Sequence, residues 1–282
     1  MPAPTPPSPP RTRFVVIAAP RTGSNWLCSL LDSHPEILCH HEIFNPEGVH
    51  YALSHRDGRL DFGGVAERDR APLAVLERVW RETAGHPIVG FKHGLGQSRE
   101  VFAAVLADRG VKKVVIRRAG RIRTYLSEQI AHRTGEWESY PGIELRERPV
   151  RVEVDARRLR EHAARNRAFY RWIAEELRAS GQTALDVLYE RLGSPSERER
   201  VQRFLGVLEV AELREATRRQ NPGALRELIA NFAELETELR GTELFAELAA
   251  ELADEPVAER PAAHGHGQAE AARRAAAARA TR

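Results

Sequence analysis

The sequence feature that most constrains the fold is an uninterrupted apolar run near the N-terminus, Phe14 to Ala19, with the length of one β-strand. Apolar side chains on both faces are typical of a strand buried inside a parallel sheet. A short loop follows, and apolar residues then recur at helical spacing as Trp26, Leu27, Leu30 and Leu31. This segment therefore predicts a strand, a tight loop and a helix.

The same alternation continues along the chain. Further strands are predicted over Ile88 to Phe91, Val111 to Ile116 and Ala184 to Tyr189. Helical patterns lie over Val101 to Leu106, Ile122 to Ile130, Leu159 to Leu177 and Val201 to Leu208, and a last helix is expected to open at Pro222 and carry one apolar stripe from Leu225 to Leu239. Strands that alternate with helices indicate a parallel sheet covered on both faces. We therefore predict an α/β fold with a P-loop-like parallel sheet.

The two ends of the chain differ in composition from the rest. Residues 1–12 are rich in proline, and residues 256–282 mix Ala, Gly, His and Arg without an apolar face, so both are expected to be disordered tails. The total of 282 residues with 42% hydrophobic content suits one core. A single domain is therefore predicted over residues 13–255.

Charge and cysteine content exclude several classes of protein. The 43 Lys and Arg nearly cancel the 40 Asp and Glu, so no overall field favours nucleic acid, and any anion binding must be local. No apolar run is long enough for a membrane span. Two cysteines, Cys28 and Cys39, without a signal segment predict a reducing, cytoplasmic setting. The oligomeric state stays open, and a homodimer is compatible with the sequence.

The first predicted loop reads Ala19-Pro-Arg-Thr-Gly-Ser-Asn-Trp26. It lies where an open α/β sheet binds its ligand, beyond the carboxyl end of a strand and at a helix N-terminus. Backbone amides there can surround a phosphate or sulfate, because Gly23 permits close approach. Further donors are Arg21 and the hydroxyls of Thr22 and Ser24. The competing interpretation is an ordinary turn with Ser24 as the N-cap.

A second segment, Val114 to Ser127, predicts another anion site. A strand that ends in Arg117 and Arg118 leads into a helix that carries Ser127. An arginine at the strand end and a serine about two turns into the helix can converge on one phosphate. Four arginines beside a positive helix N-terminus, with Arg121 and Arg123 as the other two, are unfavourable unless an anion relieves them. The alternative is that these arginines lie in solvent at the start of the helix and bind no ligand.

Both segments resemble the family of sulfotransferases that depend on 3′-phosphoadenosine 5′-phosphosulfate (PAPS), and the closest likeness is to bacterial carbohydrate sulfotransferases of the trehalose 2-sulfotransferase type. The likeness covers most of residues 13–245. Further matching pieces are Ser33 to Pro46, Val89 to Lys92, Ser127 to Ala131, Thr134 to Trp137, Tyr189 to Leu192, Arg203 to Val207, Gln220 to Pro222 and Ile229 to Asn231.

The resemblance implies a donor site in which different residues hold the two anionic ends of PAPS. Six residues of the first loop would hold the 5′-phosphosulfate, namely Arg21, Thr22, Gly23, Ser24, Asn25 and Trp26. Arg118 and Ser127 would hold the 3′-phosphate, although the spacing is one residue longer than in cytosolic eukaryotic relatives, so Arg117 is the alternative. Ala119 and Gly120 stand where relatives often carry an acidic or amide residue.

The implied reaction moves a sulfuryl group from PAPS to a hydroxyl of a small-molecule or carbohydrate acceptor and releases 3′,5′-ADP, without a metal. Arg21 would stabilise charge on the leaving oxygen. Glu42 aligns with the general base of the trehalose-type relatives, and Lys92 could reach the sulfuryl group or the acceptor. The rival bases are His40, His41 and His93.

Two other functions compete with this interpretation. A P-loop nucleotide kinase or NTPase requires a Walker A motif with its lysine and magnesium-binding hydroxyl, and the first loop lacks that pair. A non-catalytic nucleotide-binding domain would keep the fold without the base. Trp137 is expected either to stack on a sugar or adenine or to belong to the core. Segments 45–86 and 136–155 are expected to face the acceptor.

Overall fold

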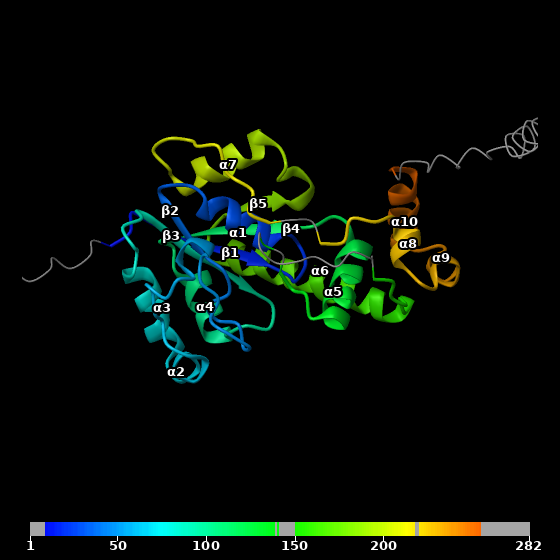
Figure 1. The fold of residues 1–282 in the computed structure, drawn as a ribbon, viewed down its shortest axis with the longest axis horizontal. Helices are drawn as coiled ribbons and strands as arrows, with labels where there is room; N and C mark the ends of the chain where they lie inside the picture. The colour runs from blue at the N-terminus through cyan, green and yellow to red at the C-terminus, as the bar shows by residue number, and fades with distance from the viewer. Residues whose placement is uncertain (1–8, 139, 141–149, 218–219, 255–282) are drawn as a thin grey trace, which may run out of the picture.

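The computed structural model describes residues 9–138, 140, 150–217 and 220–254, and five strands in this part of the chain form one parallel sheet in the order β2-β3-β1-β4-β5 (Figure 1). The strands are β1 Thr12–Ala18, β2 Ile37–His40, β3 Ile88–Gly94, β4 Val111–Arg117 and β5 Ala184–Leu188. The predicted parallel sheet is confirmed, and β1 lies at its centre.

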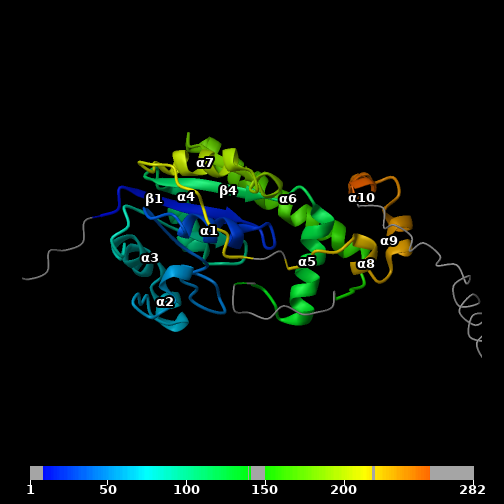
Figure 2. The same ribbon diagram turned by 45° about the horizontal axis from the view of Figure 1, so that its top comes forward.

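Helices cover both faces of this sheet, as predicted. One face packs against α1 (Ser24–Asp32) and α7 (Pro195–Leu205), and the other against α3 (Pro72–Arg81), α4 (Arg99–Ala107) and the second half of α6 (Ala156–Ala179). Figure 2 shows α7 above the strands and α3 below them. The apolar run of β1 serves both layers, because its successive side chains alternate between the two clusters. This double burial explains why the run is uninterrupted.

A third apolar cluster lies beyond the sheet, at the end of the molecule where α8, α9 and α10 gather (Figure 1). It joins α5 (Arg121–Thr134) and the start of α6 to α8 (Leu225–Leu228), α9 (Phe232–Leu239) and α10 (Glu243–Asp254). Ile122, Leu126 and Ile130 form the α5 side of this cluster. The cluster therefore anchors the helix that carries the second predicted anion segment.

The prediction of one helix opening at Pro222 is wrong, because its apolar stripe is divided between α8 and α9. Between them Ile229 forms a parallel bridge with Val152, and Ala230 N donates to Val152 O at 2.8 Å. The side chain of Asn231 bonds both backbone groups of Val154. This pairing with a segment far away in sequence outweighs the local helical pattern.

Four helices and strands, and the boundary of the predicted N-terminal tail, differ from the sequence prediction. The elements β2, α10, α2 (Val65–Arg70) and α3 were not predicted, and segment 45–86 contains the last two. The first strand begins at Thr12, inside the predicted tail, and Arg11 pairs with Glu36 at 2.6 Å. The remainder of the two predicted tails, residues 1–8 and 256–282, lies outside the described residues.

None of the described helices combines the length and the apolar character that crossing a membrane requires.

Close packing at the sheet centre predicts the effect of Gly90→Ala. A Cβ atom at Gly90 would lie 2.5 Å from ring atoms of the fully buried Phe14, so the variant must displace a core side chain. We expect urea denaturation to show a loss of about 1–3 kcal/mol in the free energy of unfolding.

The matched control is Gly64→Ala, which places a methyl group where nothing lies within 4 Å and where φ is −82°. We expect this change to stay within about 0.5 kcal/mol. Equal stability of the two variants would contradict the packing described for β1 and β3.

Candidate active site

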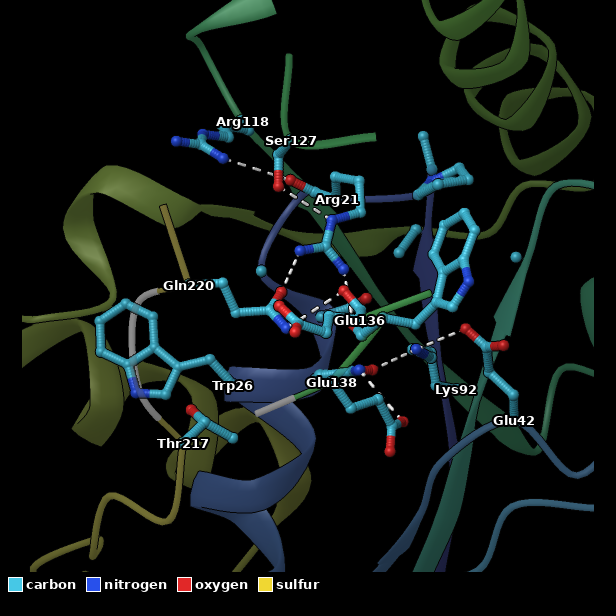
Figure 3. Close-up of a pocket in the computed structure, with 18 of the residues that line it drawn as sticks. Arg21, Trp26, Glu42, Lys92, Arg118, Ser127, Glu136, Glu138, Thr217 and Gln220 are labelled. Carbon is cyan, nitrogen blue, oxygen red and sulfur yellow. Dashed lines mark hydrogen bonds and ion pairs between the residues drawn. The ribbon is translucent and has the colours of Figure 1, made fainter. Parts of the chain in front are cut away.

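A cavity of about 1050 Å³ lies at the carboxyl edge of the sheet and collects residues from several distant segments. Ala18 at the end of β1, Lys92 and Gly94 on β3, and Arg118 just after β4 all line it. Carboxyl ends of parallel strands meet at one edge, which is the usual ligand edge of an open α/β sheet. Figure 3 shows this pocket, with Arg21 between Ser127 and Gln220, and with Lys92 directed at Glu42.

The loop between β1 and α1 has an unusual backbone. Arg21 and Gly23 both adopt positive φ angles, 62° and 87°. A Cβ atom at Gly23 would lie 2.2 Å from Cδ2 of Tyr189, so this position requires glycine both for its conformation and for its space. Tyr189 therefore packs directly on the loop.

The start of α1 is open to an anion. The helix begins at Ser24 with Gly23 as the N-cap, and no side chain caps it, so the interpretation of Ser24 as an N-cap is wrong. The first turn contains no acidic residue. Since the first amides of a helix have no intrahelical acceptor and carry a partial positive charge, they are available to an anion in the cavity that Ser24 and Asn25 line.

Thr22 supports the loop from inside. Its hydroxyl donates to Ala19 O at 2.8 Å, and Ala19 N donates to the hydroxyl of Tyr170 at 2.9 Å. That hydroxyl donates in turn to Ile116 O at 2.8 Å, which ties the loop to β4. Of the six predicted loop residues, Thr22 is the one outside the lining of this cavity. The structure thus gives its hydroxyl an internal acceptor.

Arg21 crosses the cavity and connects its walls. Its Nε donates to Ser127 Oγ at 2.9 Å and its Nη1 to Trp137 O at 2.6 Å, and its Nη2 donates to Gln220. Burial, and then the neighbouring charge of Arg118, lower the pKa of Arg21 from its usual value. An arginine in this position remains a cation. The structure therefore brings Arg21 and Ser127, predicted for opposite ends of one ligand, into direct contact.

Arg117 and Arg118 are adjacent in the sequence, but their side chains lie in different environments. Arg118 lines the cavity, lies 4.7 Å from the ring centroid of Tyr189, and donates to Arg21 O at 3.4 Å. Arg117 is outside that lining and pairs with Asp186 at 2.6 Å. Ser127 lines the cavity with Arg118. Of the two candidates left open by the sequence, Arg118 is the one beside Ser127 in the cavity.

The other arginines of this segment are neutralised by carboxylates of the protein itself. Arg121 pairs with Glu243 and Glu247 at 2.9 and 2.8 Å, and Arg123 pairs with Glu251. All three carboxylates come from α10, which the sequence did not predict. The argument that four arginines at this helix start require a bound anion therefore fails for Arg121 and Arg123, because α10 relieves them.

On the opposite wall, the partly buried Glu42 forms an ion pair with the buried Lys92. Lys92 Nζ lies 2.5 Å from Glu42 Oε1 and also donates to Asn25. Burial raises the pKa of Glu42, but the charge and hydrogen bond of Lys92 and a hydrogen bond from Asn45 outweigh it, so that the pKa of Glu42 lies below its usual value. Glu42 is therefore an ionised carboxylate, the state in which it can accept a proton.

The three rival histidines are buried in the fold. Burial lowers the pKa of His40 to about 3 and that of His93 to about 4, and burial with the nearby Lys92 lowers the pKa of His41 well below its usual value. The described residues that line the cavity include Glu42 but none of these three. Two other histidines, His50 and His132, line it instead.

Trp137 belongs to the cavity wall rather than to the core. Its side chain is 39% exposed and meets the ring of His132 edge-on at 4.8 Å. Sequence reasoning assigned no role to Glu138, whose carboxylate accepts from Asn25 at 3.2 Å, or to Tyr189, which packs on Gly23. Tyr189 lies in a segment singled out by the resemblance, whereas no local pattern marked Glu138. The described residues hold no cluster of three or more His, Cys, Asp or Glu side chains arranged to bind a metal ion.

No protein-family model matches the chain, and no curated protein sequence matches it either. Among solved structures it is similar to a sulfotransferase from Alicyclobacillus acidocaldarius, with a TM-score of 0.46 and 18% identity over 86% of this chain and 94% of that one. It is also similar to the mouse sulfotransferase SULT7A1 complexed with PAP, with a TM-score of 0.41 and 14% identity over 85% of this chain and 89% of that one. The function of this chain is therefore inferred from its own residues.

Proposed function

We propose that the protein is a sulfotransferase that moves the sulfuryl group of PAPS to a hydroxyl of a small-molecule or carbohydrate acceptor. The observation that carries the proposal is one cavity lined by two cationic sites, at the ends of β1 and β4, and by an ionised carboxylate on the opposite wall. PAPS carries negative groups at two ends, and the acceptor hydroxyl must lose a proton, so the reaction needs these three features together.

The donor is placed across the two cationic sites. The first amides of α1, with Arg21 and Ser24, suit the 5′-phosphosulfate, and Arg118 with Ser127 suits the 3′-phosphate, provided that Arg21 exchanges its hydrogen bond to Ser127 for oxygens of the donor. Between them Trp26 and Tyr189 meet edge to face with their ring centroids 5.6 Å apart. We expect the adenosine to lie against this aromatic wall, because Tyr189 contacts both the β1–α1 loop and Arg118.

Sulfuryl transfer asks the protein to align two reactants and to stabilise charge on the leaving oxygen. The acceptor oxygen forms a bond to sulfur, the bond from sulfur to the bridging oxygen of PAPS breaks, and the acceptor proton passes to Glu42. Arg21 and the α1 amides stabilise the negative charge that remains on 3′,5′-ADP. Lys92 keeps Glu42 ionised before the reaction.

The acceptor is placed beside Glu42, between parts of the two segments expected to face it. Asn45 and His50 line the cavity from segment 45–86, and Trp137 and Glu138 line it from segment 136–155. A half-exposed indole next to carboxylate and amide groups suits the apolar face and the hydroxyls of a sugar. These contacts support a carbohydrate as the acceptor class. Residues 139 and 141–149 of the second segment lie outside the described residues.

The arrangement of the two neighbouring arginines predicts their separate effects on nucleotide binding. Arg118→Ala removes a charge-assisted contact to the 3′-phosphate, and we expect 3′,5′-ADP to bind about 10- to 100-fold more weakly in calorimetric titrations without magnesium. Arg117→Ala is the matched control, because Arg117 pairs with Asp186 outside the cavity. An effect of Arg117→Ala that exceeds that of Arg118→Ala would reverse the assignment.

The position of Glu42 predicts a loss of turnover without a loss of donor affinity. Glu42→Gln keeps the shape of the side chain but removes the proton acceptor, so we expect product formation from PAPS and a panel of hydroxylated acceptors to fall by about 10²- to 10⁴-fold. The affinity for 3′,5′-ADP is expected to stay within about twofold. The control is Glu77→Gln on the exposed side of α3. Near-normal turnover of Glu42→Gln rules out this residue as the base.

The pKa of Glu42 also predicts the pH profile. A base must be deprotonated, so kcat/KM falls as the pH drops through the pKa of that base in the free enzyme. Because the pKa of Glu42 lies below its usual value, we expect the acid limb of kcat/KM to lie below about pH 4.5. Circular dichroism at each pH distinguishes this limb from unfolding. Loss of the proton-transfer step in His50→Asn with retention of turnover in Glu42→Gln would assign the base to the histidine instead.

A further inference from the structure

A second cavity, of about 380 Å³, adjoins the candidate active-site cavity. Thr22 of the β1–α1 loop, the β4–α5 connection, the first turn of α5 and the middle of α6 line it. Figure 1 shows α6 passing from beneath the sheet toward α5, and residues of both helices line this cavity. The two cavities share Arg118, and they are otherwise lined by different residues.

The lining of the second cavity is strongly cationic. It contains five arginines and no aspartate or glutamate among the described residues that form it. Arg117, Arg118 and Arg121 come from the end of β4 and the start of α5. Arg167 and Arg171 come from one face of α6. Cations from separate elements that converge on one concave space repel one another, and a bound anion removes that repulsion.

One arginine of this lining, Arg121, pairs with the largely buried Glu247 of α10 at 2.8 Å, but two others pair only with exposed carboxylates. Arg117 pairs with Asp186 and Arg167 pairs with Glu243, but the two carboxylates are 65% and 70% exposed. Pairs this exposed contribute little energy, so an anion inside the cavity competes with them easily. Arg171 has no ion-pair partner in the described part of the chain. The positive charge of Arg117, Arg167 and Arg171 is therefore only weakly offset, whereas α10 neutralises that of Arg121.

Two buried nitrogen atoms of the lining have no hydrogen-bond partner within the described residues. His162 is 2% exposed, its Nε2 lies 3.0 Å from Glu128 Oε2, and its Nδ1 is unpartnered. The Nε atom of Arg117 is also buried without a partner. Buried polar atoms are usually satisfied in folded proteins, so these two residues of the lining keep unused hydrogen-bonding capacity within the described part of the chain.

We propose that this second cavity is a binding site for a small dianion of the phosphate–sulfate class, either as the inorganic ion or as a monoester. Tetrahedral oxyanions accept several charge-assisted hydrogen bonds, and the guanidinium fork supplies them in pairs. A volume of about 380 Å³ holds such an ion, and it also accommodates a small organic group attached to it. The side chains that define the site are Arg167 and Arg171 on α6, together with Arg117 and His162.

The shared residue couples this site to the donor pocket, and this part of the inference rests on the proposed function. Arg118 lines both cavities, and Thr22, which lines the second one, holds the loop that surrounds the phosphosulfate. Two anions that draw on one arginine antagonise one another, and the effect is reciprocal by thermodynamic linkage. Occupation of the second cavity is therefore expected to weaken 3′,5′-ADP binding about two- to tenfold.

The test is calorimetric titration of the full chain with three probes, namely inorganic phosphate, inorganic sulfate and glycerol phosphate, while saturating 3′,5′-ADP occupies the donor pocket. The double variant Arg167→Ala/Arg171→Ala removes two cations from the exposed side of α6 and leaves its apolar face intact. We expect at least one probe to bind the wild type and to lose at least tenfold in affinity in the double variant. The monoester separates an inorganic ligand from an organic one.

The matched control is Arg178→Ala, an exposed arginine near the end of α6 that lies outside the cavity. Equal probe affinity in the wild type and the double variant overturns the proposal, and so does probe binding that 3′,5′-ADP abolishes completely, because the ion then occupies the donor pocket. If the protein does not bind 3′,5′-ADP, the same titrations are carried out without nucleotide. A tenfold loss in the double variant then still supports the second site, while the proposed sulfotransferase function fails.

Discussion

The in-register pairing of β1 with both of its neighbours is the constraint on which the rest of the structure depends. Ala18 pairs with Gly94 on one side and with Ile116 on the other, so three strands end at the same level. The loop after β1, Lys92 of β3 and Arg118 after β4 therefore reach one cavity without any long connection. A shift of either pairing by one residue would exchange the faces of the strand and bury these side chains in the helical layers.

Charge at this edge is arranged by long-range contacts as much as by the local sequence. The carboxylates of α10 neutralise Arg121 and Arg123, and Glu190 accepts from the amide of Ala119 at 3.1 Å. The start of α5 is thus stabilised by the protein itself. Arg21 and Arg118 instead line the candidate active-site cavity. The third apolar cluster contributes to the site in this indirect way, because it holds α10 against α5.

Local sequence patterns predicted those parts of the structure that depend on interactions between residues close together in the chain. The buried run of β1, the glycine at position 23 and the cationic end of β4 follow from strand length, loop chemistry and residue type. The division between α8 and α9 could not be predicted, because Val152 competes for the same backbone from a distant segment. Likewise no local pattern indicates that Glu138 meets Asn25, since this contact depends on how two loops pack.

Under the proposed function, the ion pair between Lys92 and Glu42 would explain how a carboxylate with a lowered pKa can act as a base. Before the donor binds, the charge and the hydrogen bond of Lys92 lower the pKa of Glu42 and keep its carboxylate ionised. A sulfuryl group in the cavity offers Lys92 other oxygen acceptors, and each contact that Lys92 makes with them weakens its hold on Glu42. The carboxylate then becomes more basic when the acceptor hydroxyl must be deprotonated. In the proposed reaction the pair would therefore link donor binding to proton transfer through the ammonium group of Lys92.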